Sequence, residues 1–247
     1  MEFYPIHFDK LNSTNDYSTQ LVAKSNPIEG TVISTYNQLS GNGQIGRKWF
    51  SDVNNNITCS IILTPNFLSI DKVFYLNIIL SLAVHSLVTN ISFKEFKIKW
   101  PNDIYFENDK IAGLLIQQII QGKSLNTTIM GVGLNVNQVI FPPDLPNPTS
   151  LFLINQQEYD LDKLLTEFLN ELGIFYERLK NREFINLKKE YLNNLYGRGE
   201  LHQFQSKEQV FEGEILGIDK NGRLSINKNG KVENFELNDI RLLLGGG

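Results

Sequence analysis

The sequence predicts an α+β fold that ends in a small all-β segment, and three patterns support this prediction. Apolar runs of strand length recur along the first 136 residues. Two longer segments, residues 71–89 and 161–179, carry apolar side chains at helical spacing. After Gly197-Arg198-Gly199, short apolar runs alternate with Asn-Gly pairs, and such pairs are the strongest short-range signal for β-hairpins.

Each element has its own local signal. The expected strands of the first part are apolar or β-branched, and they lie at residues 3–8, 30–36, 57–63, 96–100, 104–106, 111–120 and 127–136. The expected helices lie at residues 16–24, 71–89, 161–179 and 184–194, and N-cap residues 12–15 precede the first of them. The all-β segment has expected strands at residues 201–205, 208–218, 223–228 and 231–237. We therefore expect two domains, residues 1–196 and 197–247.

Composition excludes several classes of function. The chain has 247 residues and a formal net charge of −4, which argues against broad binding to nucleic-acid backbones. A single cysteine, Cys59, excludes an internal disulfide, and the three scattered histidines form no Cys/His metal cage. The N-terminus lacks a basic, apolar leader, and no run reaches the roughly 18 apolar residues of a membrane span. We expect a cytoplasmic protein with neither nucleic-acid nor membrane partners.

A long polar loop occupies residues 38–56, and loops of this length are often functional. Its segment Gly41-Asn42-Gly43-Gln44-Ile45-Gly46 matches G-x-G-x-x-G, but no helical pattern follows, so a dinucleotide-binding fold is disfavoured. Glycines can instead turn backbone N–H groups toward an anion in a nest, and Arg47-Lys48-Trp49 adds positive charge and an aromatic face. The alternative is a plain surface loop.

A second basic segment lies at a predicted strand corner. Lys99-Trp100-Pro101-Asn102-Asp103 is followed by Lys110-Ile111-Ala112-Gly113, so two lysines flank one carboxylate. Desolvating an ammonium costs free energy unless it meets an anion, which predicts an anion site here. The alternative is that Lys110 simply extends its charge into water.

Taken together, these segments resemble the biotin protein ligases. The matching segments are Ser13-Thr14-Asn15, Gln38 with residues 41–50, residues 99–103 with 110–113, residues 131–137, and Thr149-Ser150-Leu151. The resemblance extends over essentially the whole chain. It implies a catalytic domain related to class II aminoacyl-tRNA synthetases and a C-terminal SH3-like β-barrel, in a short form without an N-terminal DNA-binding domain.

The resemblance also implies a reaction. Biotin and ATP give biotinyl-5′-AMP and pyrophosphate, with Mg²⁺ held through the ATP phosphates rather than by a certain protein site. The biotinyl group then passes to a lysine of the biotin carboxyl carrier protein of acetyl-CoA carboxylase or a related carboxylase. The enzyme is expected to be a monomer or a homodimer. Two anions must meet in the first step, so a lysine that contacts both and an arginine on the phosphates would lower the barrier.

The site residues follow from the same resemblance. Those implied for biotin are Ser13, Thr14, Asn15, Gln38, Gly41, Asn42, Gly43, Gln44, Lys110, Gly113, Gly131 and Gly133. Those implied for ATP are Arg47, Trp49, Asn102, Lys110 and Asn135. Catalysis is assigned to Lys110, Arg47 and Asp103. Asp103 is the nearest candidate to orient or deprotonate the acceptor amine, and the alternative is that it only caps the turn after Pro101-Asn102.

The sequence departs from the family pattern at Asn42 and Gln44, where many relatives carry arginines. In those relatives the second of these arginines helps to retain the adenylate, so the difference leaves open how tightly this chain holds it and does not affect the reaction class. A lipoate or octanoyl ligase and a non-catalytic biotin-binding regulator remain as alternatives. The Lys-Trp-Pro-Asn-Asp and Lys-Ile-Ala-Gly segments favour biotin, and the retained Arg47 and Lys110 favour catalysis.

Overall fold

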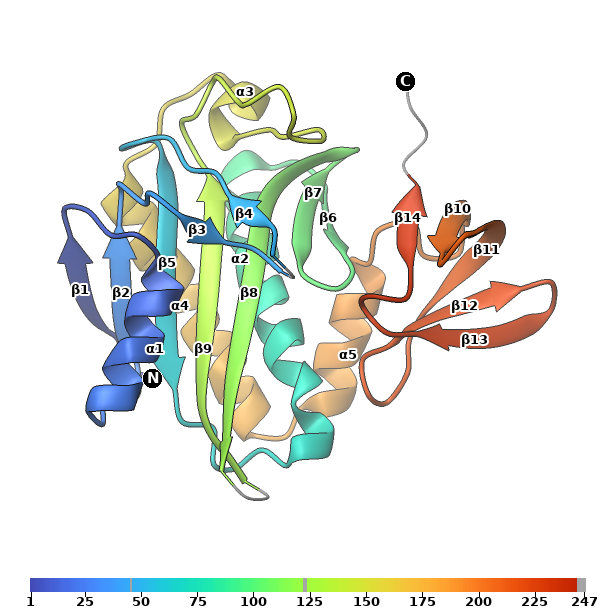
Figure 1. The fold of residues 1–247 in the computed structure, drawn as a ribbon, viewed down its shortest axis with the longest axis horizontal. Helices are drawn as coiled ribbons and strands as arrows, with labels where there is room; N and C mark the ends of the chain where they lie inside the picture. Colours follow the sequence, from blue (N-terminus) through green and yellow to red (C-terminus); the bar gives the residue numbers. More distant parts are fainter. Residues whose placement is uncertain (45, 122–123, 244–247) are drawn as a thin grey trace.

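A computed structural model describes residues 1–44, 46–121 and 124–243, and a seven-stranded sheet forms its larger part (Figure 1). The strand order is β1-β2-β5-β9-β8-β7-β6. The β1–β2 pair is parallel, and the other neighbouring pairs are antiparallel. The strands are β1 (Tyr4–Phe8), β2 (Thr31–Thr35), β5 (Asn56–Leu63), β6 (Phe96–Lys99), β7 (Asp103–Phe106), β8 (Asp109–Gln121) and β9 (Ser124–Asn135).

Different elements cover the two faces of this sheet, as Figure 1 shows. Helices α2 (Phe74–Ser92) and α4 (Leu161–Lys180) pack on one face. Helix α1 (Thr14–Lys24) and the short hairpin of β3 (Gly41–Asn42) and β4 (Lys48–Trp49) lie on the other. The remaining helices are the 3-10 turn η1 (Ile70–Lys72), α3 (Leu151–Asn155) and α5 (Phe184–Asn193).

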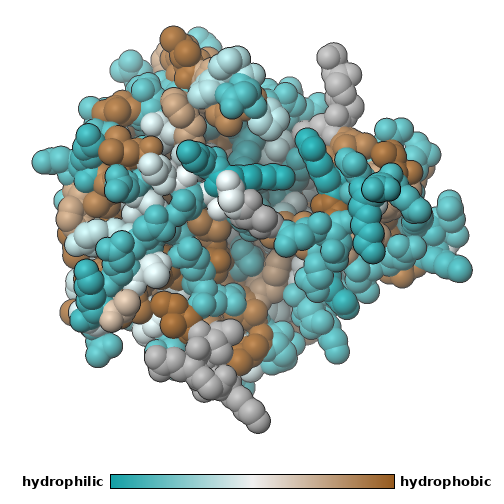
Figure 2. Space-filling model, in the orientation of Figure 1, coloured by the Kyte–Doolittle hydropathy of each residue, from teal (hydrophilic) through white to brown (hydrophobic). Residues whose placement is uncertain are grey.

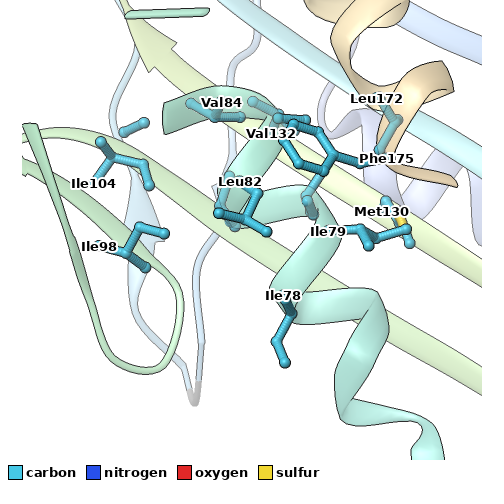
Figure 3. Close-up of a cluster of buried hydrophobic side chains, with 14 of the residues drawn as sticks. Ile78, Ile79, Leu82, Val84, Ile98, Ile104, Met130, Val132, Leu172 and Phe175 are labelled. Atoms are coloured by element: carbon cyan, nitrogen blue, oxygen red, sulfur yellow. The ribbon is translucent and has the colours of Figure 1, made fainter. Parts of the chain in front are cut away.

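The main core lies between the sheet and α2. Figure 3 shows Ile79 and Leu82 of this helix among side chains from neighbouring strands and from α4, including Met130, Val132 and Phe175. The 23-residue segment Ile70–Ser92 is long and apolar enough to cross a membrane by length and composition. Because 56% of its most apolar stretch is buried inside the molecule, its apolar character is explained by the core.

The C-terminal segment forms a five-stranded antiparallel sheet in the order β13-β12-β11-β10-β14. The strands are β10 (Leu201–Ser206), β11 (Gln209–Ile218), β12 (Leu224–Lys228), β13 (Lys231–Phe235) and β14 (Arg241–Leu243). Asn229 and Gly230 have φ of 52° and 79°, which confirms the predicted hairpin turn. No ladder joins β13 to β14 in the described residues, so the structure shows an open five-stranded antiparallel sheet, with no closed barrel, where the SH3-like β-barrel was expected. The three-residue strand β14 pairs with β10 at one edge and leaves β13 as the other.

Hydrogen bonds from Trp100 and Lys188 tie the turn between β11 and β12 to the larger part of the molecule. Trp100 Nε1 donates to the carbonyl oxygen of Gly222 at 2.8 Å, in the turn between β11 and β12. Gly222 has φ of 85° and lies against the ring of Phe74, where a Cβ atom would clash. Buried side chains of the two parts belong to one continuous cluster, as Phe204 and Ile98 illustrate. The predicted division at residue 196 falls between α5 and β10 and stays a prediction.

The structure confirms the α+β class and most predicted elements, with ends shifted by a few residues. Three features were not predicted. Helix α3 and strand β14 lie in segments that the sequence analysis left without an element, and the β3–β4 hairpin lies inside the loop at residues 38–56.

Candidate active site

A cavity of about 200 Å³ opens on the sheet face that α1 and the β3–β4 hairpin cover. Its walls come from the start of α1, from residues 38–50, from β8 and β9, and from the connector that follows β9. The predicted site residues that line it are Ser13, Thr14, Asn15, Gln38, Asn42, Gly43, Gln44, Arg47, Trp49, Asn102, Asp103, Lys110, Gly113, Gly131, Gly133 and Asn135. Gly41 was also predicted and is not among the residues that line it. One end of the cavity is polar and neutral, and the other carries charge.

The neutral end is a network of polar side chains at the N-terminus of α1. Ser13 caps the helix, since its hydroxyl accepts from the backbone N–H of Asp16 at 3.2 Å. The backbone N–H of Thr14 donates to Gln38 Oε1 at 2.9 Å. Ser60 Oγ lies 2.8 Å from Thr14 Oγ1 and is also hydrogen-bonded to Asn15 Oδ1. These groups are therefore held in place before any ligand arrives.

Ser60 was not predicted as part of this network. It lies on β5 and is fully buried. In the sequence it stands in an apolar run of strand length, and such a pattern indicates a core strand rather than a site residue. A hydroxyl in a buried strand needs a hydrogen-bond partner, and this requirement is the feature of the sequence that could have pointed to Ser60.

Three predicted floor glycines lie where large side chains pack closely. A Cβ on Gly113 would lie 2.8 Å from Trp49 Cζ3, and one on Gly133 would clash with the same indole. A Cβ on Gly131 would clash with Asn15 Oδ1. The glycines make room for Trp49 and Asn15 in this structure, and their contact with a ligand stays a prediction.

The glycine loop differs from the predicted anion nest. The N–H of Gly43 donates to the carbonyl oxygen of Arg47 at 2.8 Å, and the N–H of Arg47 donates to Gln44 at 3.1 Å. The hairpin therefore uses the Gly43 N–H internally, so this donor does not point toward an anion in this structure. Gly41 pairs with Trp49 in the same hairpin. Asn42 Nδ2 donates to Asp16 Oδ1 at 2.8 Å and thereby fastens the loop to α1.

The charged end is built around an ion pair between β7 and β8. Lys110 Nζ lies 2.7 Å from Asp103 Oδ1, and the two side chains are 30% and 21% exposed. Lys110 also lies over the Trp49 ring, at 5.6 Å from the centroid. Asn102 fixes the corner, because its Nδ2 donates to the carbonyl oxygen of Leu114. The Lys110 side chain lines the cavity, at the corner where the sequence predicted an anion site.

Asn135 supplies an oxygen that has no protein partner. Its Nδ2 donates to the Thr149 carbonyl oxygen at 2.9 Å, while its buried Oδ1 has no hydrogen-bond partner among the described residues. An amide oxygen is a ligand type that Mg²⁺ accepts alongside phosphate oxygens. In the described residues, no group of three or more His, Cys, Asp or Glu side chains could hold a metal by itself.

A second cavity, of about 860 Å³, lies between the β6–β7 corner and the C-terminal sheet. It shares Arg47, Asp103 and Lys110 with the first cavity, so the two meet at the ion pair. Its walls also include Lys99 of β6 and Arg241 of β14, neither of which was predicted as a site residue.

Lys99 is the most perturbed cation of this region. Its Nζ lies 3.2 Å from Tyr105 Oη and 4.5 Å from the centroid of the same ring. Burial lowers the pKa of Lys99 to about 8. The negative charge of Asp103 opposes this shift, whereas the positive charges of Lys110 and Arg241 add to it.

A family model described as the biotin/lipoate A/B protein ligase family matches residues 7–135, which is more than half of the chain. The chain belongs to this family. The matched segment runs from β1 to the end of β9 and contains every predicted site residue.

Individual relatives agree with the assignment to the biotin/lipoate ligase family. The bifunctional ligase/repressor BirA of Bacillus subtilis is 28% identical over 242 residues, which cover 96% of this chain and 73% of that protein. The biotin–[acetyl-CoA-carboxylase] ligase of Mycobacterium tuberculosis is 28% identical over 163 residues, covering 65% of this chain and 59% of that protein. The biotin protein ligase of Aquifex aeolicus, solved with biotin and ATP, has a TM-score of 0.82 at 24% identity and covers 98% of this chain and 99% of its own. The last likeness shows the fold, and together the comparisons confirm the predicted resemblance.

Proposed function

We propose that the chain is an ATP-dependent biotin protein ligase, which forms biotinyl-5′-AMP and transfers biotin to a lysine of a carrier protein. The observation that carries this proposal is the position of the Lys110–Asp103 pair. It stands where a neutral polar pocket meets a cationic cavity. Biotin has a matching division, with a polar neutral ring at one end and a carboxylate at the other.

The neutral end fits a ureido ring better than a dithiolane or an alkyl chain. A ureido group offers two N–H donors and one carbonyl acceptor, and Ser13, Thr14, Asn15 and Gln38 surround this end with complementary groups. Lipoate and octanoate carry no polar group there and would leave these side chains unpaired on binding. Leaving buried polar groups without partners costs about 1–3 kcal/mol each, which favours biotin. The names of the relatives, which specify biotin, support the same choice.

In the proposed first step, a carboxylate oxygen of biotin attacks the α-phosphorus of ATP. One O–P bond forms, the bond to the β-phosphate oxygen breaks, and pyrophosphate leaves with the electron pair. Lys110 contacts both anions, and Arg47 contacts the phosphates, so their charges offset the repulsion and stabilise the transition state. Mg²⁺ would supply further positive charge to the phosphates, and Asn135 Oδ1, which has no hydrogen-bond partner among the described residues, is a protein oxygen that could help to hold it.

In the proposed second step, the acceptor lysine must lose a proton before it attacks the acyl-adenylate. Asp103 is part of the boundary between the two cavities, where it can orient the amine or take the proton. A biotin carboxyl carrier protein is the proposed acceptor, in line with the name of the Mycobacterium relative. A cytoplasmic location and a monomeric or homodimeric state stay predictions.

The test is acyl transfer to a purified biotin carboxyl carrier domain, followed by intact mass. The chain, ATP and Mg²⁺ are incubated with biotin, lipoate or octanoate in separate reactions. We expect a mass increase with biotin alone, and no increase when the acceptor lysine is replaced by arginine. A larger increase with lipoate than with biotin would reassign the substrate. Pyrophosphate release without transfer would limit the activity to the first step.

A further inference from the structure

Two segments that border the first cavity meet at the same point of the large sheet. The loop that carries the β3–β4 hairpin ends at Asn56, and the connector that lines the cavity with Phe141 starts just after Asn135. Asn56 and Asn135 are directly opposed in the β5–β9 ladder. The backbone N–H of Asn137 donates to the carbonyl oxygen of Asn55 at 2.7 Å, so the two segments leave the sheet side by side.

Gln138 joins these two segments through its side chain, which is fully buried. Its Oε1 accepts hydrogen bonds from Asn56 Nδ2 and from the backbone N–H of Asp52, the latter at 3.3 Å. Its Nε2 donates to the carbonyl oxygen of Ile140 at 2.8 Å. One amide group therefore bonds both to the end of the hairpin loop and to the start of the connector.

The same network extends to the neighbour of Asn135 and to the far end of the connector. Asn56 Oδ1 accepts from the backbone N–H of Val136, the residue that follows Asn135, at 3.0 Å. The carbonyl oxygen of Gln138 accepts from Ser150 Oγ at 2.6 Å, and this bond closes the base of the connector.

The far end of the connector is bonded to the backbone of Lys110. The N–H of Lys110 donates to the Asn147 carbonyl oxygen at 2.7 Å, and the N–H of Thr149 donates to the Lys110 carbonyl oxygen at 2.9 Å. Thr149 also accepts the hydrogen bond from Asn135 Nδ2. A displacement of the connector at Gln138 would therefore displace the partners of both Lys110 and Asn135.

A contribution to stability does not explain why an amide stands at position 138. A buried polar side chain costs free energy unless its groups are paired, and an apolar residue of the same shape would avoid this cost. The amide supplies direction instead, because a fully paired buried network permits only one relative position of the segments that it joins. In the part of the chain that the structure describes, every side-chain partner of Gln138 belongs to one of the two segments at the cavity.

We propose that Gln138 is a positioning residue for the nucleotide. Its side chain is not among those that line the cavity, so it acts by holding the hairpin loop and the connector in a fixed relation, and thereby places Phe141 and Asn135. Biotin binding should depend on Gln138 less, because Thr14 and Ser60 hold the neutral end from α1 and β5. The inference rests on the proposed function for the identity of the nucleotide, but the position of the two segments can be measured without any reaction.

The main experiment measures nucleotide binding by Gln138→Met, which keeps the length of the side chain and removes its hydrogen-bonding groups. The biotin-loaded chain is titrated in a calorimeter with Mg²⁺ and α,β-methylene-ATP, an analogue that cannot release pyrophosphate. We expect the Kd for this analogue to rise about tenfold, from the loss of the bonds that place the connector. The Kd for biotin should stay within about threefold of the native value, which also shows that the variant is folded.

A second variant and a matched control complete the titration. Gln138→Glu keeps an oxygen that accepts from Asn56 and Asp52, so its nucleotide affinity should lie between those of the native chain and Gln138→Met. The control is Asn155→Leu on α3, which removes hydrogen bonds of 2.8 Å and 2.7 Å that do not involve the hairpin loop. It should bind the nucleotide as the native chain does.

Three results of this titration would overturn the proposal. The first is nucleotide binding by Gln138→Met within about threefold of native affinity. The second is an equal loss of biotin and nucleotide affinity, which a general loss of structure would produce. The third is a loss in Asn155→Leu as large as that in Gln138→Met. If Gln138→Met does not fold, native nucleotide affinity in Gln138→Glu would overturn the proposal by itself.

Hydrogen exchange of the ligand-free chains tests whether Gln138 joins the two segments. Backbone amides of residues 50–55 and 139–147 should both exchange faster in Gln138→Met than in the native chain, because each segment loses a bond to the same side chain. In Asn155→Leu both segments should exchange at the native rate. Faster exchange of the connector alone would show that Gln138 does not hold the hairpin loop.

Biotin-dependent ATP–pyrophosphate exchange separates this inference from the proposed function. In Gln138→Met the KM for ATP should rise while the KM for biotin stays near the native value. Exchange with an unchanged KM for ATP would overturn the positioning role and leave the ligase function standing. A native chain that shows no exchange, but whose nucleotide affinity depends on Gln138, would overturn the ligase function and uphold the positioning role.

Discussion

The two ends of the candidate site are prepared for their ligands in opposite ways. At the neutral end, Thr14, Asn15, Gln38 and Ser60 already bond to one another or to the backbone, so the network exists before biotin arrives. At the cationic end, among the described residues, Lys99 lies in the second cavity without an anionic partner. The first arrangement fixes the positions of the hydrogen-bonding groups, and the second leaves a positive charge free to attract an anion.

This difference follows from the ligands. A neutral ring is recognised by the direction of its hydrogen bonds, so fixed partners reject molecules without matching groups. A polyanion is recognised mainly by charge, and cations held apart from carboxylates interact with it strongly in a partly buried site. The burial of Lys99 is unfavourable in the empty protein, and a bound anion would relieve it. On Figure 2, hydrophilic side chains predominate over the C-terminal sheet, the region that contributes Arg241.

The strongest test of the cationic end is Lys110→Ala. We expect adenylate formation to fall by about 10²–10³, because the variant loses the one side chain that would contact both reacting anions. The fold should persist, since Asp103 is 21% exposed and can be hydrated when its partner is removed. Biotin-dependent ATP–pyrophosphate exchange measures the effect, and Lys97→Ala is the control. Exchange within a few-fold of the native rate would remove Lys110 from the chemistry.

The corresponding test of the neutral end is Thr14→Val, which keeps the shape and removes the hydroxyl. Ser60 Oγ loses its contact at 2.8 Å, and the ligand loses one hydrogen-bonding group. We expect the Kd for biotin to rise about ten- to a hundredfold, from the cost of unpaired buried polar groups, with little change in pyrophosphate affinity. Calorimetry measures both constants. Thr19→Val on the exposed side of α1 is the control, and equal biotin affinity in the two variants would show that the network does not bind biotin.

Local sequence patterns were sufficient to predict most of the fold and part of the candidate site. The hydrophobic periodicity of α4, the N-cap at Ser13 and the Asn-Gly turns depend on nearby residues, and each lies where predicted. Helix α3 was missed because it has five residues, too few to show a period, although Ser150 caps it. The resemblance to a known family then brought Lys110 and Asp103 together in one predicted site.

Contacts between distant segments could not be read from the sequence. Arg241 reaches the site only because the C-terminal sheet docks beside the β6–β7 corner, where Trp100 binds Gly222. The open C-terminal sheet and the internal use of the Gly43 N–H depend on strand pairing that the residue pattern leaves undetermined. The sequence analysis noted Lys99 only as one of two lysines that flank a carboxylate, and its lack of an anionic partner among the described residues depends on Asp103 pairing with Lys110.

The unfavourable burial of Lys99 predicts a stability effect that can be measured without ligands. Its pKa is about 8 in the folded state against an ordinary value of 10.5. Below pH 8 the lysine is charged in both states, so the cost of burying it is fully present. As the pH rises from 8 toward 10.5, the folded state loses the proton first, and the free energy of unfolding increases.

Lys99→Met should therefore be more stable than the native chain by about 1–3 kcal/mol at pH 7, because the side chain remains partly exposed. The gain should shrink as the pH rises above 8. Urea unfolding at pH 7 and pH 9 measures the difference, and subtraction of the two chains cancels the titration of tyrosines. Lys97→Met should show no gain, because Lys97 is paired with Glu95. A destabilised Lys99→Met variant would mean that Lys99 supports the fold rather than an absent anion.

The smallest expected effect concerns the loop that joins the two ends. Asn42→Ala removes the hydrogen bond to Asp16 at 2.8 Å, which is exposed to solvent and fastens the β3–β4 hairpin to α1. Without ligand, cleavage by a protease within residues 38–56 should be about two- to fivefold faster than in the native chain, the amount that one such bond is worth. Biotin should slow cleavage in both chains, since the loop covers the pocket that it would fill. Val53→Ala, an exposed change in the same loop, is the control, and it should be cut at the native rate. If biotin leaves the cleavage rate unchanged in every chain, the loop does not close over the ligand, and the neutral end alone holds biotin.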